Sequence, residues 1–127
     1  MKKIMYSGSD GCSLAAWKTD PAGDLVSVLL HGGGPDHYSL AQLARKLSDL
    51  TQVIVPDIHG YGVSVCTDPD CHTWKQYAED IQSLLDHLNA EKAVVGGTGL
   101  GATISLRFAL ALHPAGLDFL EPQAAQD

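Results

Sequence analysis

The sequence has few basic side chains and no long hydrophobic run. Its 127 residues include 8 Lys and Arg against 15 Asp and Glu, which gives a formal net charge of −7. Because no basic patch offsets the repulsion of phosphates, no nucleic-acid partner is expected. The longest apolar stretch, residues 100–112, is interrupted by Ser105 and Arg107 and is too short to span a bilayer, so no membrane partner is expected either.

Cysteine is also scarce, with residues at positions 12, 66 and 71 only. Any disulfide scheme leaves one of the three unpaired. Lys2 and Lys3 are not followed by the apolar segment that forms the core of a signal peptide, so no export signal is predicted. Reduced thiols and a cytoplasmic location are therefore expected, and Cys12 is interpreted as a small core side chain.

The hydrophobic periodicity predicts an alternation of strands and helices after an N-terminal hairpin, whose turn is marked by Asp10-Gly11. This order predicts a single domain of the α/β class, with a mostly parallel sheet of five or six strands, an antiparallel hairpin at its start and helices on both faces. The hairpin is expected at residues 1–20, strand–helix units at 25–50, 53–89 and 93–114, and a weak tail with one short strand (117–120) at 115–127.

Local signals predict the ends of the helices. Ser39 is expected to cap a helix that places Leu43 and Leu50 among its core-facing residues. Thr73 and Gln76 have the spacing of a capping box at the start of the next helix. Asn89 suits a left-handed exit from that helix.

Three glycine-rich loops follow the predicted parallel strands, at residues 31–38, 57–64 and 96–101. The carboxyl ends of such strands meet at one edge of the sheet, where α/β proteins bind ligands. Glycines there allow backbone amides to approach a ligand closely. The loops also contain His37 and His59, whose roles the sequence leaves open. We expect the functional site at this edge.

Four segments carry a resemblance to a known family. They read LLHGGGPDHYSLAQLARKLS, VIVPDIHGYGVS, YAEDIQSLLDHLNAEKAVVGG and GTGLGATISLRFALALHP. In this order and at these separations they resemble the N-terminal half of an α/β-hydrolase-fold protein over residues 4–114. The resemblance implies a lineage that cleaves esters or other acyl compounds with water, a small-molecule substrate, and no cofactor.

The resemblance also implies the positions of the site residues. In the family, the loop after the third strand supplies an oxyanion amide, which falls on Gly33, with Gly34 and His31 beside it at the substrate-binding edge. The turn after the fifth strand is the nucleophile elbow, G-x-S-x-G, and the residue after the nucleophile supplies the second amide. That amide falls on Leu100.

The turn Gly97-Thr98-Gly99-Leu100-Gly101 can be aligned with this elbow in two ways. With glycines at both flanks, Gly99 stands at the nucleophile position and the expected serine is absent. With Thr98 as the nucleophile, Leu100 has to occupy a flank, where strand and helix pack almost in contact and a leucine does not fit. We therefore place the missing nucleophile at Gly99 and keep Thr98 as the alternative.

The catalytic acid and histidine of the family follow the nucleophile in the chain. Here His113 is expected at the far end of a helix, and Asp118 and Glu121 lie in the short tail, so no suitable pair is present. Loss of a catalytic nucleophile costs on the order of 10⁶ in turnover. The chain is therefore expected to be inactive as written, whether it is a truncated product, a natural pseudoenzyme or an engineered variant.

Two other functions are compatible with the sequence. Gly97-x-Gly99-x-x-Ala102 fits a dinucleotide-binding fingerprint, with Glu121 about twenty residues on, although too few residues follow for the rest of such a fold. The second of these functions is that of a non-catalytic interaction fragment. The strand at residues 93–95 would form an uncovered sheet edge beside an apolar helix, which predicts a homo-oligomer or a partner chain.

The remaining polar residues are given structural interpretations. Cys66, Cys71 and His72, with two aspartates between them, lack C-x-x-C spacing and a defined fourth ligand. A solvated loop is therefore favoured over a metal site. Asp57 ends a strand at the functional edge and is expected to stabilise the turn that follows by accepting bonds from the backbone amides of Gly60 or Tyr61.

Overall fold

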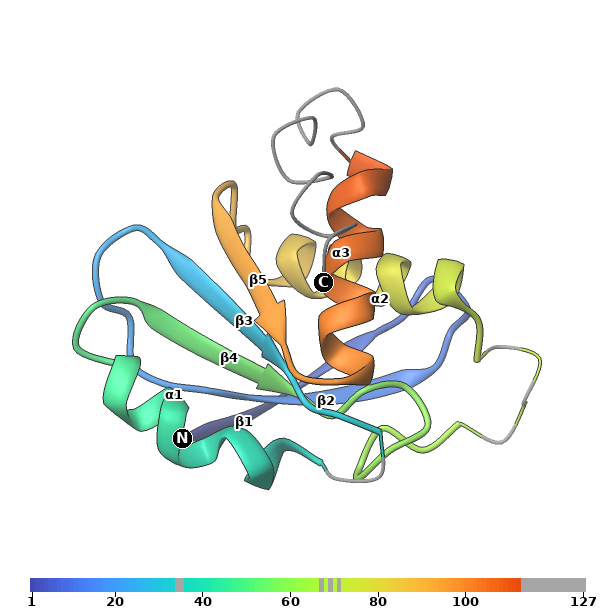
Figure 1. Ribbon diagram of the computed structural model, residues 1–127, viewed down its shortest axis with the longest axis horizontal. Helices are drawn as coiled ribbons and strands as arrows, with labels where there is room; N and C mark the ends of the chain where they lie inside the picture. Colours follow the sequence, from blue (N-terminus) through green and yellow to red (C-terminus); the bar gives the residue numbers. More distant parts are fainter. Residues whose placement is uncertain (34–35, 67, 69, 71, 113–127) are drawn as a thin grey trace.

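A computed structural model describes residues 1–33, 36–66, 68, 70 and 72–112 of the chain. In this part a single sheet carries helices on both faces, which confirms the predicted α/β class (Figure 1). The strands are β1 (Lys2–Ser7), β2 (Ser13–Lys18), β3 (Val26–Leu30), β4 (Gln52–Pro56) and β5 (Ala93–Gly97). The helices are a 3-10 turn η1 (His37–Leu40), α1 (Ala41–Leu47), α2 (Trp74–His87) and α3 (Leu100–Leu112).

The strand order is β1-β2-β4-β3-β5. β1 pairs antiparallel with β2, and β2 pairs antiparallel with β4. β3 is parallel to both β4 and β5. The hairpin is thus an antiparallel extension of a parallel core, as predicted, and β5 is an edge strand among the described residues. The expected strand at 117–120 and the rest of the tail lie outside the described residues.

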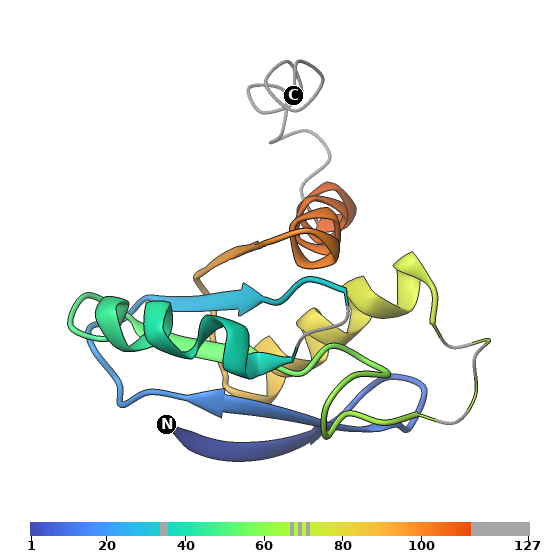
Figure 2. The same ribbon diagram turned by 60° about the horizontal axis from the view of Figure 1, so that its bottom comes forward.

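The two faces of the sheet carry separate hydrophobic clusters, because successive side chains of a strand point to opposite faces. Ile54 of β4 joins the larger cluster, which contains the buried side chains of α2 and α3. Its neighbours Val53 and Val55 join the smaller cluster beneath α1. Figure 2 shows α1 and α3 on opposite sides of the sheet. In the described part of the chain, no helix has the length and apolar character needed to cross a bilayer.

The helix ends follow the sequence signals in two places and depart from them in one. Thr73 Oγ1 accepts from the Gln76 N–H at 3.1 Å, and Asn89 has a φ of 53°. Ser39 does not cap α1. Asp36 caps the 3-10 turn instead by accepting from the Tyr38 N–H at 3.0 Å, and the Ser39 hydroxyl donates back to the Asp36 carbonyl.

The short length of α1 also changes which leucines are buried. The helix ends at Leu47, so Leu50 lies beyond it and is 78% exposed, and Leu43 is 45% exposed. Leu40 and Ala44 supply the buried contacts of this face instead. The prediction that Leu43 and Leu50 face the core was therefore wrong.

The expectation of reduced thiols is also wrong for two of the cysteines. Cys12 and Cys66 form a disulfide, with their Cα atoms 6.3 Å apart, within the range that disulfides require. The bond joins the end of the hairpin turn to the loop after β4. The two residues are 54 positions apart in sequence, and only the packing of the turn against that loop brings them together. Cys12 does contact the larger hydrophobic cluster, as expected of a core side chain. Cys71 lies outside the described residues.

Candidate functional site

The turn from β5 into α3 lies beside the carboxyl ends of β3 and β4 (Figure 1). Its glycines differ in the room around them. A Cβ on Gly97 would overlap the carbonyl oxygen of Leu30 and lie 2.8 Å from the carbonyl carbon of Gly101. A Cβ on Gly101 would overlap the same oxygen and lie 2.7 Å from the carbonyl oxygen of His31. Both positions therefore require glycine, because strand and helix are in backbone contact there.

Gly99, between them, is in a different environment. A Cβ at this position would meet only Gly32 Cα, at the ordinary contact distance of 3.6 Å. Its φ is +54°, a left-handed conformation that side chains adopt at some cost. The alternative alignment, with Thr98 as the nucleophile, places its flanks at Gly96 and Leu100. An added Cβ on Gly96 has nothing within 4 Å, so that flank has no steric need for glycine. The crowding matches the frame centred on position 99.

The loop after β3 faces this turn. Gly32 is the neighbour of Gly99, and a Cβ on Gly33 would lie 4.0 Å from Leu100 Cβ and 3.8 Å from the Tyr61 hydroxyl. The three glycine loops therefore meet at one edge of the sheet, as the sequence predicts. Gly34 lies outside the described residues.

His31 holds two of these loops together. Its ring is fully buried at the end of β3. Nε2 accepts from the Ile58 N–H at 2.9 Å, so this nitrogen carries no proton, and Nδ1 is the nitrogen that donates to the Gly32 carbonyl at 2.6 Å. Since both ring nitrogens bond to the backbone, His31 positions the loops after β3 and β4 beside the turn.

Asp57 performs a similar task between the loops after β3 and β4. Its carboxylate is buried, and Oδ1 accepts from the backbone N–H of His37 at 2.8 Å and pairs with the ring Nδ1 of the same residue at 2.8 Å. Oδ2 accepts from the Val63 N–H at 2.9 Å. Asp57 does bond to the turn that follows, but through the amide of Val63, because the expected donors Gly60 and Tyr61 donate to the carbonyls of Ser64 and Ile58. The bonds to His37 join a segment twenty residues away. The His37 ring stacks on Trp17, with centroids 3.4 Å apart.

His59 and Asp80 lie beneath the loops, toward α2. His59 is buried, and its Nε2 pairs with Asp10 Oδ2 at 2.8 Å. Asp80 Oδ1 accepts from the Gln76 amide at 2.8 Å. Burial raises the pKa of Asp80 to about 6, an effect opposed by the Gln76 hydrogen bond and by His59. No local pattern singles out these two aspartates. Asp10 pairs with a residue 49 positions away, and the burial of Asp80 on α2 depends on the packing of that helix.

Comparisons with known proteins agree with this architecture. The sequence pattern of the alpha/beta hydrolase family matches residues 28–126. The magnesium-chelatase 30 kDa subunit of Rhodobacter capsulatus is 40% identical over 92 residues, which are 72% of this chain and 32% of that protein. The 3-hydroxybutyrate-oligomer hydrolase of Cupriavidus necator is 32% identical over 91 residues, which are 71% of this chain and 31% of that protein.

Solved structures show the same likeness. The crystal structure of an alpha/beta hydrolase from Novosphingobium aromaticivorans superposes with a TM-score of 0.81 and 27% identity, over 90% of this chain and 40% of that one. The chain spans about a third of the length of the two curated relatives above.

Proposed function

Because the chain belongs to the alpha/beta hydrolase family, we propose that it carries the oxyanion-binding half of an ester- or acyl-hydrolase site, with Gly99 at the nucleophile position. The observation that carries the proposal is the contrast within the turn. Gly97 and Gly101 have no room for a side chain, whereas Gly99 between them has both the room and a left-handed φ. This combination is what a nucleophile elbow needs, since the nucleophile projects from a sharp strand-to-helix turn.

The oxyanion donors in this proposal are the backbone amides of Gly33 and Leu100. Support comes from the approach of the two residues, whose Cβ positions are 4.0 Å apart, and from the start of α3 at Leu100. The amino end of a helix favours negative charge. Each such donor is worth roughly 3 kcal/mol of transition-state stabilisation. His31 is a positioning residue, because its two ring nitrogens are bonded to the loops that flank the donors.

We further propose that the chain by itself does not hydrolyse esters. Gly99 has no nucleophilic atom, and both ring nitrogens of His31 at the sheet edge are engaged. His31 holds backbone groups through both ring nitrogens, and His37 and Asp57 hold each other. His113, Asp118 and Glu121 lie outside the described residues. An attack on a carbonyl would therefore need a nucleophile from elsewhere.

The test is restoration of the nucleophile. Gly99→Ser would be introduced into this chain fused to the C-terminal part of the Cupriavidus necator 3-hydroxybutyrate-oligomer hydrolase, and p-nitrophenyl acetate and butyrate would be assayed. Thr98→Ser in the same fusion is the matched control. We expect turnover from Gly99→Ser and none from the fusion without substitution or from Thr98→Ser. Turnover from Thr98→Ser, or none from a folded Gly99→Ser fusion, would reject the frame.

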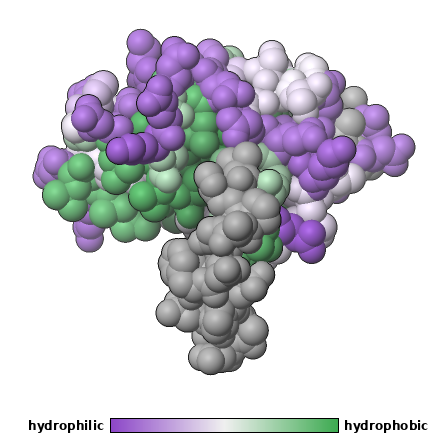
Figure 3. Space-filling model, turned by 90° about the horizontal axis from the view of Figure 1, so that it is seen from above, coloured by the Kyte–Doolittle hydropathy of each residue, from purple (hydrophilic) through white to green (hydrophobic). Residues whose placement is uncertain are grey.

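A second candidate is a non-catalytic role in an assembly, favoured by the apolar edge that β5 forms within the described part of the chain. Val94 of β5 is 52% exposed and Leu106 of α3 is 40% exposed. Figure 3 shows hydrophobic surface on the side where β5 and α3 lie. An unpaired edge strand beside an apolar face recruits further chain. The 40% identity to a subunit of magnesium-chelatase is consistent with such a role.

Sedimentation tests this second candidate. The chain is expected to self-associate at micromolar concentration, and Val94→Lys is expected to reduce the association, because a lysine on an edge strand opposes pairing. Lys92→Arg, which leaves the charge unchanged, is the control. A monomer at all concentrations would reject self-association.

The dinucleotide interpretation has less support, because that fingerprint follows the first strand of its fold, whereas this turn follows β5. A thermal shift with NAD would revive it.

A further inference from the structure

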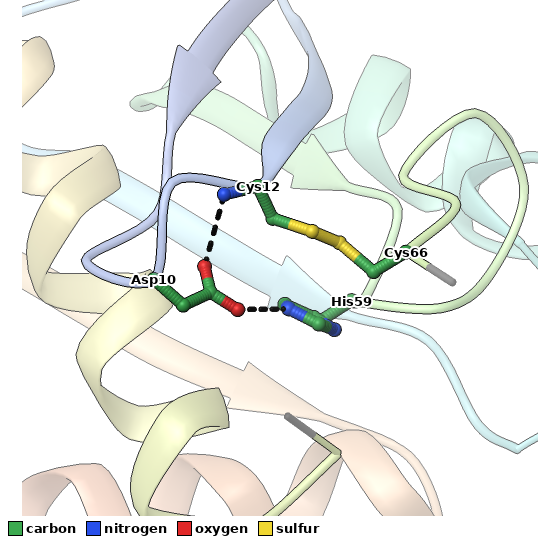
Figure 4. Close-up of side chains that lie close together, drawn as sticks. All are labelled: Asp10, Cys12, His59 and Cys66. Carbon is green, nitrogen blue, oxygen red and sulfur yellow. Dashed lines mark hydrogen bonds and ion pairs between the residues drawn. A yellow bond between two sulfur atoms is a disulfide. The ribbon is translucent and has the colours of Figure 1, made fainter. Parts of the chain in front are cut away.

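A second cluster of reactive side chains lies away from the glycine loops. It contains Asp10 in the β1–β2 turn, Cys12 just before β2, and His59 and Cys66 in the loop after β4 (Figure 4). One ligand atom from each lies within 4.8 Å of the others. In a tetrahedral zinc site with bonds of about 2.0 to 2.3 Å, neighbouring ligand atoms are roughly 3.3 to 3.8 Å apart. The cluster therefore has the dimensions of a metal site.

The chemistry of the four ligands is selective. Two thiolates, an imidazole and a carboxylate suit Zn²⁺ and disfavour Mg²⁺ and Ca²⁺, which prefer oxygen. His59 is buried, Cys12 and Cys66 are half-buried, and the Asp10 side chain, though only 12% exposed, is more open to solvent than that of His59, so an ion would enter from the side of Asp10. In the structure the two sulfurs are joined in a disulfide. A bonded sulfur pair cannot serve as two thiolate ligands, so the disulfide and a metal would be alternatives at one place.

We propose that the reduced protein binds one Zn²⁺ ion through Cys12, Cys66, His59 and Asp10, and that the disulfide is the oxidised, metal-free form. A dithiol reductant supplies two electrons and two protons. The S–S bond breaks, two thiols form, and the reductant becomes a disulfide. On binding, the ion displaces the two thiol protons to water. The proton of the neutral His59 ring, which lies on Nε2 and faces Asp10 Oδ2 at 2.8 Å, moves to Nδ1, so that Nε2 and the Asp10 carboxylate are both free to bind the ion.

The surroundings of His59 support this assignment independently. Among the described residues, His59 Nδ1 and Asp80 Oδ2 are buried atoms without a hydrogen-bond partner. Both residues line the same cavity of about 20 Å³, which has room for one water. With a metal on Nε2, the neutral imidazole carries its proton on Nδ1 and needs an acceptor. A water between Nδ1 and the Asp80 carboxylate would satisfy both atoms.

The two states would hold the same segments together. Either the disulfide or the ion joins the hairpin turn to the loop after β4, so the fold is retained in both. This site differs from the group of Cys66, Cys71 and His72 considered from the sequence, because it takes two of its ligands from the hairpin turn. Only the packing of that turn against the loop creates it.

Cobalt(II) titration of the full chain tests the proposal, because Co²⁺ substitutes for Zn²⁺ and reports thiolate ligation by near-ultraviolet charge-transfer absorption. After reduction by a phosphine, which is then removed, we expect one Co²⁺ per chain, displacement by Zn²⁺, and no such absorption from the oxidised protein. Cys12→Ser and Cys66→Ser should each weaken Co²⁺ binding at least tenfold. Cys71→Ser, which changes the cysteine outside the proposed ligand set, should leave binding unchanged.

The serine variants could lose metal binding simply because they misfold. Asp10→Asn controls for this, because it changes a proposed ligand and keeps both sulfurs. We expect this variant to bind Co²⁺ at least threefold more weakly than the unsubstituted chain, with circular dichroism unchanged. The proposal is overturned if the reduced chain shows no thiolate–cobalt absorption. It is also overturned if binding survives in both Cys12→Ser and Cys66→Ser, if Asp10→Asn binds as tightly as the unsubstituted chain, or if Cys71→Ser abolishes binding.

Discussion

The β5–α3 turn and the loops after β3 and β4 meet at one edge of the sheet, yet they are built in opposite ways. The turn is shaped by side chains that are missing, since Gly97 and Gly101 allow backbone contact. The loops are shaped by buried polar side chains, and both His31 and Asp57 use their polar atoms to hold backbone groups. In this chain, a buried histidine and a buried aspartate hold the loops in place, and Gly99, the position proposed for the nucleophile, has no side chain.

The largest expected effect comes from adding a methyl group to the turn. Gly101→Ala places a Cβ against the carbonyls of Leu30 and His31, so the backbone has to move apart. We expect a loss of about 3 kcal/mol or more in the free energy of unfolding, measured by urea denaturation. Gly96→Ala is the matched control, because nothing lies within 4 Å of its added Cβ. A gain of about 0.5 kcal/mol is expected there. Equal effects of the two substitutions would contradict the claim that backbone contact in the turn requires glycine at position 101.

Reduction of the Cys12–Cys66 disulfide is expected to have the next largest effect. The bond closes a loop of 54 residues, and because disulfides often deliver less than the chain-entropy model predicts, we expect a loss of about 2 to 3 kcal/mol. Urea midpoints would be compared with and without reductant, in the presence of a chelator so that no metal replaces the bond. Unchanged midpoints would show that these cysteines are not joined in solution.

A substitution at Asp57 tests whether the polar loops are structural. Asp57→Asn can keep its contacts with His37 through one oxygen, but its amide group would face the Val63 N–H, which now donates to Oδ2. We expect a loss of about 2 kcal/mol in stability, from two donors facing each other. Asp36→Asn should change stability by less than about 0.5 kcal/mol, since asparagine caps as well as aspartate. If Asp57→Asn left stability unchanged, the carboxylate would not be structural.

The smallest expected effect is a gain in stability. Burial raises the pKa of Asp80 to about 6, above its ordinary value of 3.8, so the folded protein holds this proton more tightly than the unfolded chain does. The contribution of this group is fully present below pH 3.8 and is lost as the pH rises through 6. Asp80→Asn should therefore stabilise the protein by about 1 to 2 kcal/mol at pH 7.5 and by much less at pH 4. Urea denaturation at both pH values measures this, and equal effects would exclude titration of Asp80.

The sequence could predict features that depend on local patterns, but not those that depend on contacts between distant segments. Strand and helix periods are local patterns, and they predicted the sheet and, within the part of the chain that the structure describes, the place of β5 at its edge. The Cys12–Cys66 bond and the Asp10–His59 pair join segments about fifty residues apart, and no local pattern reports such a contact.

The error at Ser39 has another cause. Asp36 and Ser39 are both good capping residues in the same turn, and the choice depends on the 3-10 geometry that precedes α1. Sequence spacing does not specify that geometry. The burial of Leu43 and Leu50 was misjudged for a related reason, since the helix stops at Leu47 while the apolar spacing continues past it.

The most direct measurement of the central claim is the pKa of a thiol introduced at position 99. Gly99→Cys and Thr98→Cys would each be made in a Cys71→Ser background with the disulfide intact, and the rate of alkylation followed against pH. With Gly99→Cys, the thiol would stand at the amino end of α3 beside Gly33 and Leu100. Its pKa is expected at least one unit below the ordinary value of about 8.5, while Thr98→Cys gives an ordinary thiol. A pKa at or above 8.5 with Gly99→Cys would contradict the proposed site.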